Sequence, residues 1–194
     1  LHGGSASDQY FWNGNGVRQG NDVDRSKYND KTHRWAIDYS SFKPGFNGFW
    51  GFPKDAKTAE LGTWHGNVDV QQQLDFITRV KSQPLITVNA GTGTAKDAAE
   101  WVRWANKKMS YNVRYWEIGN ELGGAWESGA LRPDGKTMDG TIYGGIYSEF
   151  ARAMKAVDSS IWVGSQGGVD FIRGALARKE APVDFVTFHD YYNA

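Results

Sequence analysis

The sequence predicts an α/β fold in which parallel strands alternate with crossover helices. Short apolar runs of strand type recur between residues 84 and 189, and segments with the apolar spacing of a helix separate them. This strict alternation favours parallel strands, because parallel neighbours need a long crossover connection. Four such strands do not close a barrel, which typically has eight strands and about 250 residues. The sequence is therefore compatible with a small open sheet or with the middle of a barrel.

The first third of the chain has a different character. Residues 13–67 are rich in Gly, Asn, Asp and aromatic residues, show little periodicity, and contain Asn-Gly and Pro-Gly turn signals. We expect a long loop region with short irregular elements there. Its aspartates do not follow the spacing of a calcium-binding loop, so no metal site is predicted.

Residues 68–194 are expected to form regular βα units. An apolar stripe over residues 70–80 predicts a helix, and the run at residues 84–90 predicts a strand. Thr94 and Asp97 then have the form of a capping box. The stripe that follows, at residues 98–109, predicts the next helix.

The same alternation continues to the end of the chain. Strands are predicted at residues 113–119, 161–165 and 183–189, and helices at residues 143–154 and 171–176. The sequence contains no internal repeat. We expect residues 1–194 to be part of a single domain.

Composition removes several functional classes. Twenty-two basic residues balance 22 acidic residues, so no net charge would attract nucleic acid or an anionic membrane surface. No run of about 18 apolar residues is present to span a bilayer. Cysteine is absent, which excludes disulfides, thiolate catalysis and cysteine-ligated zinc.

Aromatic residues are abundant for a chain of this size. The 194 residues include nine Trp, nine Tyr and ten Phe. Aromatic rings suit the C–H faces of sugars, so the excess favours a carbohydrate ligand. A core built largely of rings is the alternative for any single Trp. The chain starts at Leu1 without Met or a signal peptide, which predicts the interior of a longer protein.

The run Tyr115–Glu121 is the most informative segment for function. It reads as a strand that ends in Gly-Asn-Glu, and the carboxyl ends of parallel strands carry the working residues of such folds. A Glu held there beside an amide and aromatic rings can act as a general acid at a glycosidic oxygen. The alternative is a Glu that forms a salt bridge or caps the following helix.

Trp116–Glu121 (WEIGNE) resembles the acid/base motif of clan A glycoside hydrolases, particularly arabinofuranosidase-like and related polysaccharide-cleaving members. Leu1–Ser5 is similar to the turn after their second strand, with His2 where Pro is common. Residues 86–94 resemble the third strand and its loop, and residues 183–192 resemble the sixth strand. The resemblance implies a retaining enzyme on a (β/α)8 TIM barrel, of which this chain would be part, without a cofactor or metal.

The resemblance also implies roles for individual residues. Glu121 would be the acid/base, and Asn120 would bind the 2-hydroxyl of the sugar. His189 and Tyr191 would shape the site and bind the opposing carboxylate. A barrel histidine with satisfied hydrogen bonds is the alternative for His189, and strand alternation leaves the choice between Tyr191 and Tyr192 open.

Ser5, Asn89 and Trp126 complete the implied substrate-binding residues. Ser5 belongs to the first of the matching turns and Asn89 to the end of the third-strand match. Trp126 begins a long insertion, residues 126–145, that we expect to border the cleft.

The family's nucleophile is a Glu at the end of the seventh strand, beyond the sixth strand with which this chain ends. Glu117 is expected deeper in the barrel than Glu121, since both lie on one strand. Glu127, Asp170 and Asp190 are expected on loops as solvated charges. None of these carboxylates convincingly replaces the nucleophile.

The leading hypothesis is a secreted or extracytoplasmic retaining hydrolase of plant cell-wall polysaccharide, acting on an arabinofuranoside, xylan or β-glucan. The alternative is a non-catalytic sugar-binding fragment or pseudo-enzyme on the same scaffold. A nucleotide-binding domain built on the turn at Gly91–Thr94 is disfavoured, because neither phosphate-loop pattern is complete. The expected partner is a polysaccharide or oligosaccharide, with self-association if the barrel is incomplete.

Overall fold

The computed structural model of the chain describes residues 3–4, 7–8, 10–12, 16–17, 24–29, 34–36, 70–127, 129–132 and 134–189. Its strands are β1 (Tyr10–Phe11), β2 (Gly16–Val17), β3 (Asp24–Asn29), β4 (Arg34–Ala36), β5 (Leu85–Val88), β6 (Tyr115–Ile118), β7 (Trp162–Ser165) and β8 (Phe185–Val186). Its helices are α1 (Val70–Arg79), α2 (Ala95–Val102), the π-helix η3 (Arg103–Lys108), α3 (Gly140–Val157) and α4 (Val169–Leu176).

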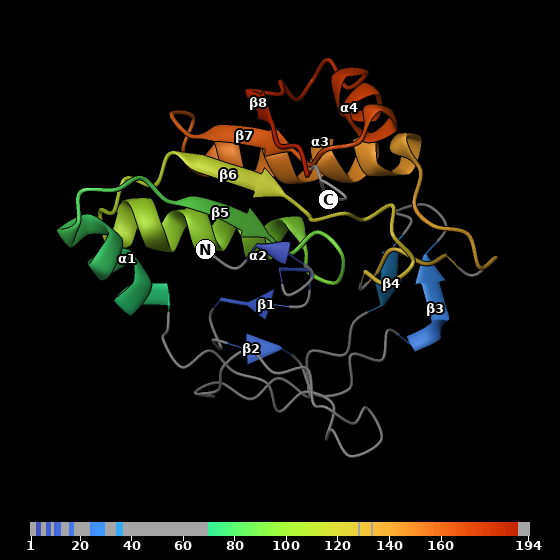
Figure 1. Ribbon diagram of the computed structural model, residues 1–194, viewed down its shortest axis with the longest axis horizontal. Helices are drawn as coiled ribbons and strands as arrows, with labels where there is room; N and C mark the ends of the chain where they lie inside the picture. The colour runs from blue at the N-terminus through green and yellow to red at the C-terminus, as the bar shows by residue number, and fades with distance from the viewer. Residues whose placement is uncertain are drawn as a thin grey trace, which may run out of the picture.

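The strands β5 to β8 form one parallel sheet whose order follows the sequence (Figure 1). The register of β5 and β6 runs from Leu85 opposite Tyr115 to Val88 opposite Ile118. In a doubly wound sheet the strand order reverses at a switch point, whereas a barrel keeps the order of the sequence. Helices α2 and α3 lie together on one face of this sheet (Figure 1). The predicted α/β fold is confirmed, and its topology is that of part of a (β/α)8 barrel.

The helix-covered face of the sheet holds the hydrophobic core. Ile86, Trp116 and Val163 form one cross-strand row and are fully buried. The ring of Trp101, on α2, meets that of Trp116 edge-on with centroids 5.8 Å apart. Burial of large rings and branched aliphatic side chains between sheet and helices is the main stabilising contribution in such layers.

The opposite face of the sheet corresponds to the barrel interior. Glu117 lies on this face, 4% exposed, and accepts hydrogen bonds from the hydroxyls of Thr87, at 2.8 Å, and of Thr187. One row nearer the amino ends of the strands, the rings of Tyr115 and Trp162 meet edge-on at 5.8 Å. Glu117 therefore lies on the barrel-interior face as predicted, with both of its carboxyl oxygens accepting threonine hydroxyls.

Helix α2 begins as its sequence predicts. The hydroxyl of Thr94 accepts from the backbone N–H of Asp97, and the Asp97 carboxylate accepts from the backbone N–H of Thr94. The helix predicted over residues 98–109, however, changes to a π-helix from Arg103 onward. Within η3 the amide of Asn106 is buried and bonds both the N–H and the C=O of Val113. Apolar spacing predicted the helix but not the change to π-winding, in which each backbone hydrogen bond spans five residues instead of four.

Helices α3 and α4 cross through three glycines. A Cβ atom at Gly144 would lie 2.2 Å from the carbonyl oxygen of Gly174, and one at Gly174 would lie 1.7 Å from that of Gly140. The two backbones are therefore in direct contact. The carboxylate of Asp170, in the first turn of α4, accepts the Gly140 N–H at 2.6 Å and so caps α3.

Short strands near the N-terminus fall largely within the region predicted to be irregular. Strand β1 pairs antiparallel with β2, and β3 pairs antiparallel with β4. The other residues of the stretch 13–67 lie outside the described residues, so the prediction of a long loop region there remains untested.

Several of the tryptophans belong to the core. Trp12 stacks on Trp101 with centroids 6.1 Å apart and planes 12° apart, and contacts Trp104 at 5.4 Å. Its indole N–H donates to the carbonyl of Asp97 at 3.2 Å. The ring-rich core considered from composition is therefore real for these residues and for Trp116.

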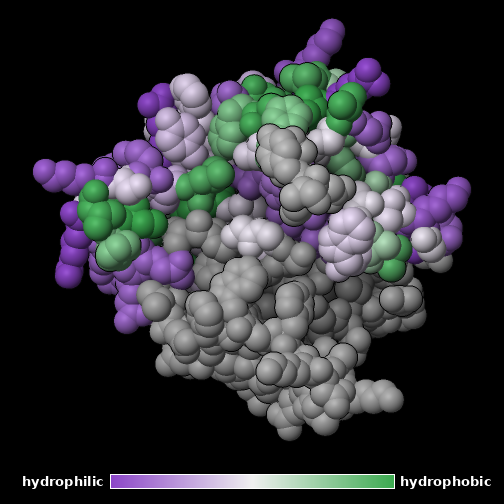
Figure 2. Space-filling model, in the orientation of Figure 1, coloured by the Kyte–Doolittle hydropathy of each residue, from purple (hydrophilic) through white to green (hydrophobic). Residues whose placement is uncertain are grey.

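In the view of Figure 2 the exposed apolar surface includes patches over α1 and around α4 and β8. Phe76 and Val80 are 65% and 53% exposed on α1, and Val169 and Leu176 are 62% and 60% exposed on α4. None of the helices among the described residues has both the length and the apolar character needed to cross a bilayer.

Candidate active site

Glu121 stands just past the carboxyl end of β6, where the backbone turns sharply. Gly119 and Glu121 both have positive φ, at 75° and 46°. The left-handed conformation suits glycine but is strained for glutamate, at about 1–2 kcal/mol. The carbonyl of Glu121 accepts the N–H of Gly124 at 2.7 Å, which closes the turn. Strain of this kind persists only where the surroundings hold the backbone, and it is frequent at functional sites.

The side chain of Glu121 meets His189. The Nδ1 atom of His189 and the Oε1 atom of Glu121 are 2.6 Å apart, with the two side chains 33% and 23% exposed. His189 follows β8, so the contact joins the carboxyl ends of β6 and β8. A separation this short requires a proton between the two atoms. Two residues that the resemblance assigned to the active site are thus brought together at the edge of the sheet where such folds carry their active sites.

Asn120 is held on both its backbone and its side chain. Its backbone N–H donates to Asp8 at 3.0 Å, and its side-chain amide donates to Glu127 at 3.3 Å. Asn120 is 2% exposed and Glu127 is 3% exposed. The expectation that Glu127 is a solvated loop charge is therefore wrong: it lies on a loop, but is buried beside Asn120.

Asp8 is a site residue that the sequence did not reveal. It is fully buried, and its two carboxylate oxygens accept the backbone N–H groups of Gly91 and Asn120 at 3.1 and 3.0 Å. Asp8 thereby ties the loops that follow β5 and β6 to the N-terminal segment. Burial raises the pKa of the Asp8 carboxyl well above its usual range, and the charge of Glu127 raises it further, against the backbone donors.

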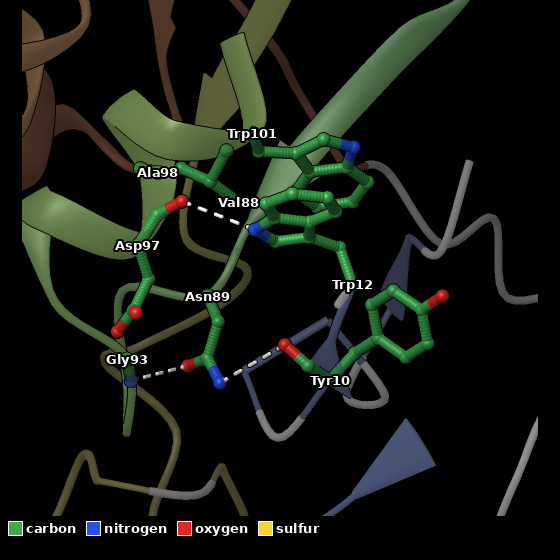
Figure 3. Close-up of a pocket in the computed structure, with 8 residues that line it drawn as sticks. All are labelled: Tyr10, Trp12, Val88, Asn89, Gly93, Asp97, Ala98 and Trp101. Carbon is green, nitrogen blue, oxygen red and sulfur yellow. Dashed lines mark hydrogen bonds between the residues drawn. The ribbon is translucent and has the colours of Figure 1, made fainter. Parts of the chain in front are cut away.

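Asn89, at the end of β5, organises a turn (Figure 3). Its side-chain oxygen accepts the N–H groups of Thr92 and Gly93 at 2.8 and 2.9 Å, and its amide nitrogen donates to the carbonyl of Tyr10 at 3.3 Å. Both the oxygen and the nitrogen of the Asn89 side chain are therefore hydrogen-bonded within the chain. Asn89 also lines a small space together with Tyr10, Trp12 and Trp101, among others, where the N-terminal segment packs against α2.

Trp126 projects from the loop that follows Glu121. It is 71% exposed, in contrast to the buried core tryptophans. Its ring lies across Gly124, where a Cβ atom would be 2.4 Å from the ring. The absence of a side chain at Gly124 gives the ring its place, and most of Trp126 remains open to solvent.

Of the remaining residues that the sequence singled out, three lie outside the described residues and one is described. Ser5, Tyr191 and Asp190 lie outside the described residues. Asp170 was expected on a loop, and this was wrong: it lies in α4 and its carboxylate caps α3. Across the described part of the chain, no group of three or more His, Asp or Glu side chains could hold a metal ion.

No protein-family model matches the chain. Curated relatives are nonetheless recognisable. An intracellular exo-α-(1→5)-L-arabinofuranosidase of Acetivibrio thermocellus is 28% identical over 148 residues, which cover 64% of this chain and 28% of that protein. A probable α-L-arabinofuranosidase C of Aspergillus flavus is 27% identical over 129 residues, covering 56% of this chain and 24% of that protein. The predicted resemblance to arabinofuranosidases is confirmed.

Solved structures show the same fold. The family 51 α-L-arabinofuranosidase of Bifidobacterium longum aligns with a TM-score of 0.64 at 18% identity, over 100% of this chain and 36% of that chain. These comparisons establish that the described sheet and helices are part of a TIM barrel. The chain spans only about a third of that structure and less than a third of the curated relatives.

Proposed function

We propose that this chain is part of the catalytic domain of a retaining glycoside hydrolase acting on plant cell-wall polysaccharide, and that it supplies the acid/base. The observation that carries the proposal is the 2.6 Å contact of His189 with Glu121 at the carboxyl edge of the sheet. The names of the relatives make α-L-arabinofuranosides the first substrates to consider.

In this mechanism Glu121 protonates the leaving glycosidic oxygen and later removes a proton from the attacking water. His189 shares the proton of Glu121 and holds the carboxyl group in one orientation. Because Glu121 is partly exposed while Glu117 and Glu127 are buried, it is the one of the three that a glycosidic oxygen can approach.

Asn120 and Trp126 support the substrate in the same proposal. Asn120 stays the predicted partner of the sugar 2-hydroxyl, an interaction that typically strengthens in the transition state, although the structure has it 2% exposed with its amide nitrogen donating to Glu127. The open face of Trp126 packs against a sugar ring. Asn89 acts indirectly by shaping the turn after β5, since the hydrogen bonds of its amide lie within the chain. Ser5 and Tyr191 stay predicted substrate contacts.

A panel of 4-nitrophenyl glycosides and polysaccharides tests the proposal on the full protein that carries this chain. We expect hydrolysis of α-L-arabinofuranosides with retained anomeric configuration, followed by ¹H NMR. Binding of arabinan or xylan without hydrolysis would favour the non-catalytic alternative. Extracytoplasmic location stays a separate prediction, since one relative is described as intracellular.

A further inference from the structure

The backbone is fixed on both sides of Glu121 by side chains from distant parts of the sequence. On one side, the N–H of Asn120 donates to Asp8. On the other side, the N–H of Leu122 donates to the side-chain oxygen of Gln166 at 3.0 Å. The side chain of Leu122 is itself fully buried. The strained backbone of Glu121 is therefore held between two buried acceptors.

Gln166 stands on a rigid part of the fold. It follows β7 directly and is 1% exposed. Its backbone N–H donates to the hydroxyl of Tyr143 at 3.1 Å, and that hydroxyl donates to the carbonyl of Ile118 at 2.8 Å. A side chain of α3 thus links the ends of β6 and β7, which fixes the distance between Gln166 and the Glu121 turn.

The amide of Gln166 is used on its oxygen side alone. Its nitrogen is buried, and no hydrogen-bond partner for it exists among the described residues. An unsatisfied buried donor typically destabilises a fold by about 1–3 kcal/mol. An apolar side chain of similar size would avoid this penalty, so packing does not account for a glutamine here. The acceptor for Leu122 is the feature that an apolar residue cannot supply.

From this arrangement we propose that Gln166 is a positioning residue for Glu121. By holding the Leu122 peptide, it keeps Glu121 in the left-handed conformation that directs its carboxyl group to His189. The inference rests on the proposed function for its kinetic consequence, but the contact itself can be tested without catalysis.

The test compares two variants in the full protein. Gln166→Met keeps the size of the side chain and removes the acceptor. Asn106→Leu is the matched control, because Asn106 is also a buried amide that accepts a backbone N–H, that of Val113 at 2.8 Å. Asn106 lies near the opposite end of β6, so its loss should lower stability without affecting Glu121.

For Gln166→Met we expect kcat/KM for an unactivated arabinan oligosaccharide to fall about 10–100-fold, since small misplacements of a catalytic group have effects of that size. The value of kcat/KM reports the glycosylation step, in which Glu121 protonates the leaving oxygen. For 4-nitrophenyl α-L-arabinofuranoside kcat/KM should fall less than about threefold, because a good leaving group needs little protonation. Asn106→Leu should affect both substrates equally. Equal losses on both substrates for Gln166→Met would overturn the proposal.

A spectroscopic measurement keeps the inference separate from the enzymatic activity. The ¹⁵N signal of His189 Nδ1 reports its contact with Glu121, and we expect it to move in Gln166→Met but not in Asn106→Leu. The Leu122 N–H should exchange with solvent faster in Gln166→Met, which lacks the acceptor. It should exchange slowly again in Gln166→Glu, which keeps an acceptor oxygen. If the protein hydrolyses no glycoside, an altered Nδ1 signal still supports the positioning role. An unchanged Nδ1 signal in a folded Gln166→Met protein contradicts it.

Discussion

Glu121 differs from Glu117 and Glu127 in what surrounds its carboxyl group. Glu117 is enclosed by threonine hydroxyls, and Glu127 is buried against the amide of Asn120. Glu121 has a backbone held by its neighbours, a histidine in contact, and a side chain 23% exposed. A general acid needs this combination, because it must exchange protons with solvent and still keep one orientation toward substrate.

The substitution Glu121→Gln should leave the fold intact and abolish hydrolysis of unactivated polysaccharide in any active form of the protein. An amide keeps the shape of the side chain but cannot donate the proton, and general acid catalysis typically contributes about 10²–10⁴-fold. Glu149→Gln, on an exposed position of α3, is a control that should retain full activity. Initial rates on arabinan and on 4-nitrophenyl glycosides measure the effect. Wild-type rates for Glu121→Gln on arabinan would show that its assigned role is wrong.

Asp8 should give the stability of the protein a distinct pH dependence. Its pKa is raised in the folded state, so the folded protein binds this proton more tightly than the unfolded chain. The resulting stability is complete below about pH 4, the ordinary pKa of aspartate, and is lost as pH rises toward the raised pKa. Asp8→Asn cannot lose a proton and should remove this component.

Urea unfolding between pH 4 and pH 8 measures how the free energy of unfolding changes with pH in the wild type, in Asp8→Asn and in Asp134→Asn. Asp134 is exposed and serves as the control. We expect the pH dependence to be the same in the wild type and in Asp134→Asn, and to be weaker in Asp8→Asn. The same pH dependence in all three proteins would mean that Asp8 ionises in the folded protein as it does in the unfolded chain.

The sequence predicted single residues better than their partners. Glu121 could be named from its place at the end of a recognisable strand and from the WEIGNE resemblance, and His189 from the resemblance of residues 183–192 to the sixth strand of clan A glycoside hydrolases. Asp8 could not, because its function depends on a contact with Asn120, 112 residues away, that no local pattern encodes. The contact between Gln166 and Leu122 spans 44 residues and was missed for the same reason.

At the scale of the elements, the crossing of α3 and α4 provides a paired test. Gly144→Ala should destabilise the protein by roughly 1–3 kcal/mol, because its new methyl group would overlap the backbone of Gly174. Gly145→Ala, at the next position, should stabilise it by about 0.5–1 kcal/mol, since alanine favours a helix interior and only Arg178 is near, at 3.7 Å. Thermal unfolding of both variants measures the difference. Equal effects would indicate that the two helices separate freely.

Strands and helices were predicted well where their signals are local. The capping box of Thr94 and Asp97 fixes the start of α2 within a few residues of sequence. The winding of η3 and the placement of Asp170 in a helix were not predicted. Asn106 depends on Val113 and Asp158, and Asp170 depends on Gly140, so both features are set by packing between elements.

At the scale of the whole molecule, the described sheet has four strands and leaves β5 and β8 at its edges. Unpaired strand edges promote association. We therefore expect the 194-residue chain on its own to self-associate or aggregate, which size-exclusion chromatography with light scattering will measure.

The same isolated chain should not form a glycosyl-enzyme with one of its own carboxylates. A retaining nucleophile must lie about 5–5.5 Å from the acid/base, and Glu117 is already engaged by Thr87 and Thr187. A fluoroglycoside probe analysed by mass spectrometry tests this. A stable monomer labelled at Glu117, Glu127, Asp170 or Asp190 would overturn the prediction and identify a different nucleophile.

The contacts among three tryptophan rings have a consequence for spectroscopy. Trp12, Trp101 and Trp116 form a chain of rings with centroids 5.8–6.1 Å apart, joining the N-terminal segment to α2 and to β6. Indoles at such separations couple electronically, so their near-ultraviolet circular dichroism depends on mutual orientation. Trp12→Phe would replace the outermost indole by a phenyl ring and remove the contribution of that indole to the signal. The part of the near-ultraviolet signal that Trp12→Phe removes would then report whether the segment that carries Asp8 is docked, with no added label.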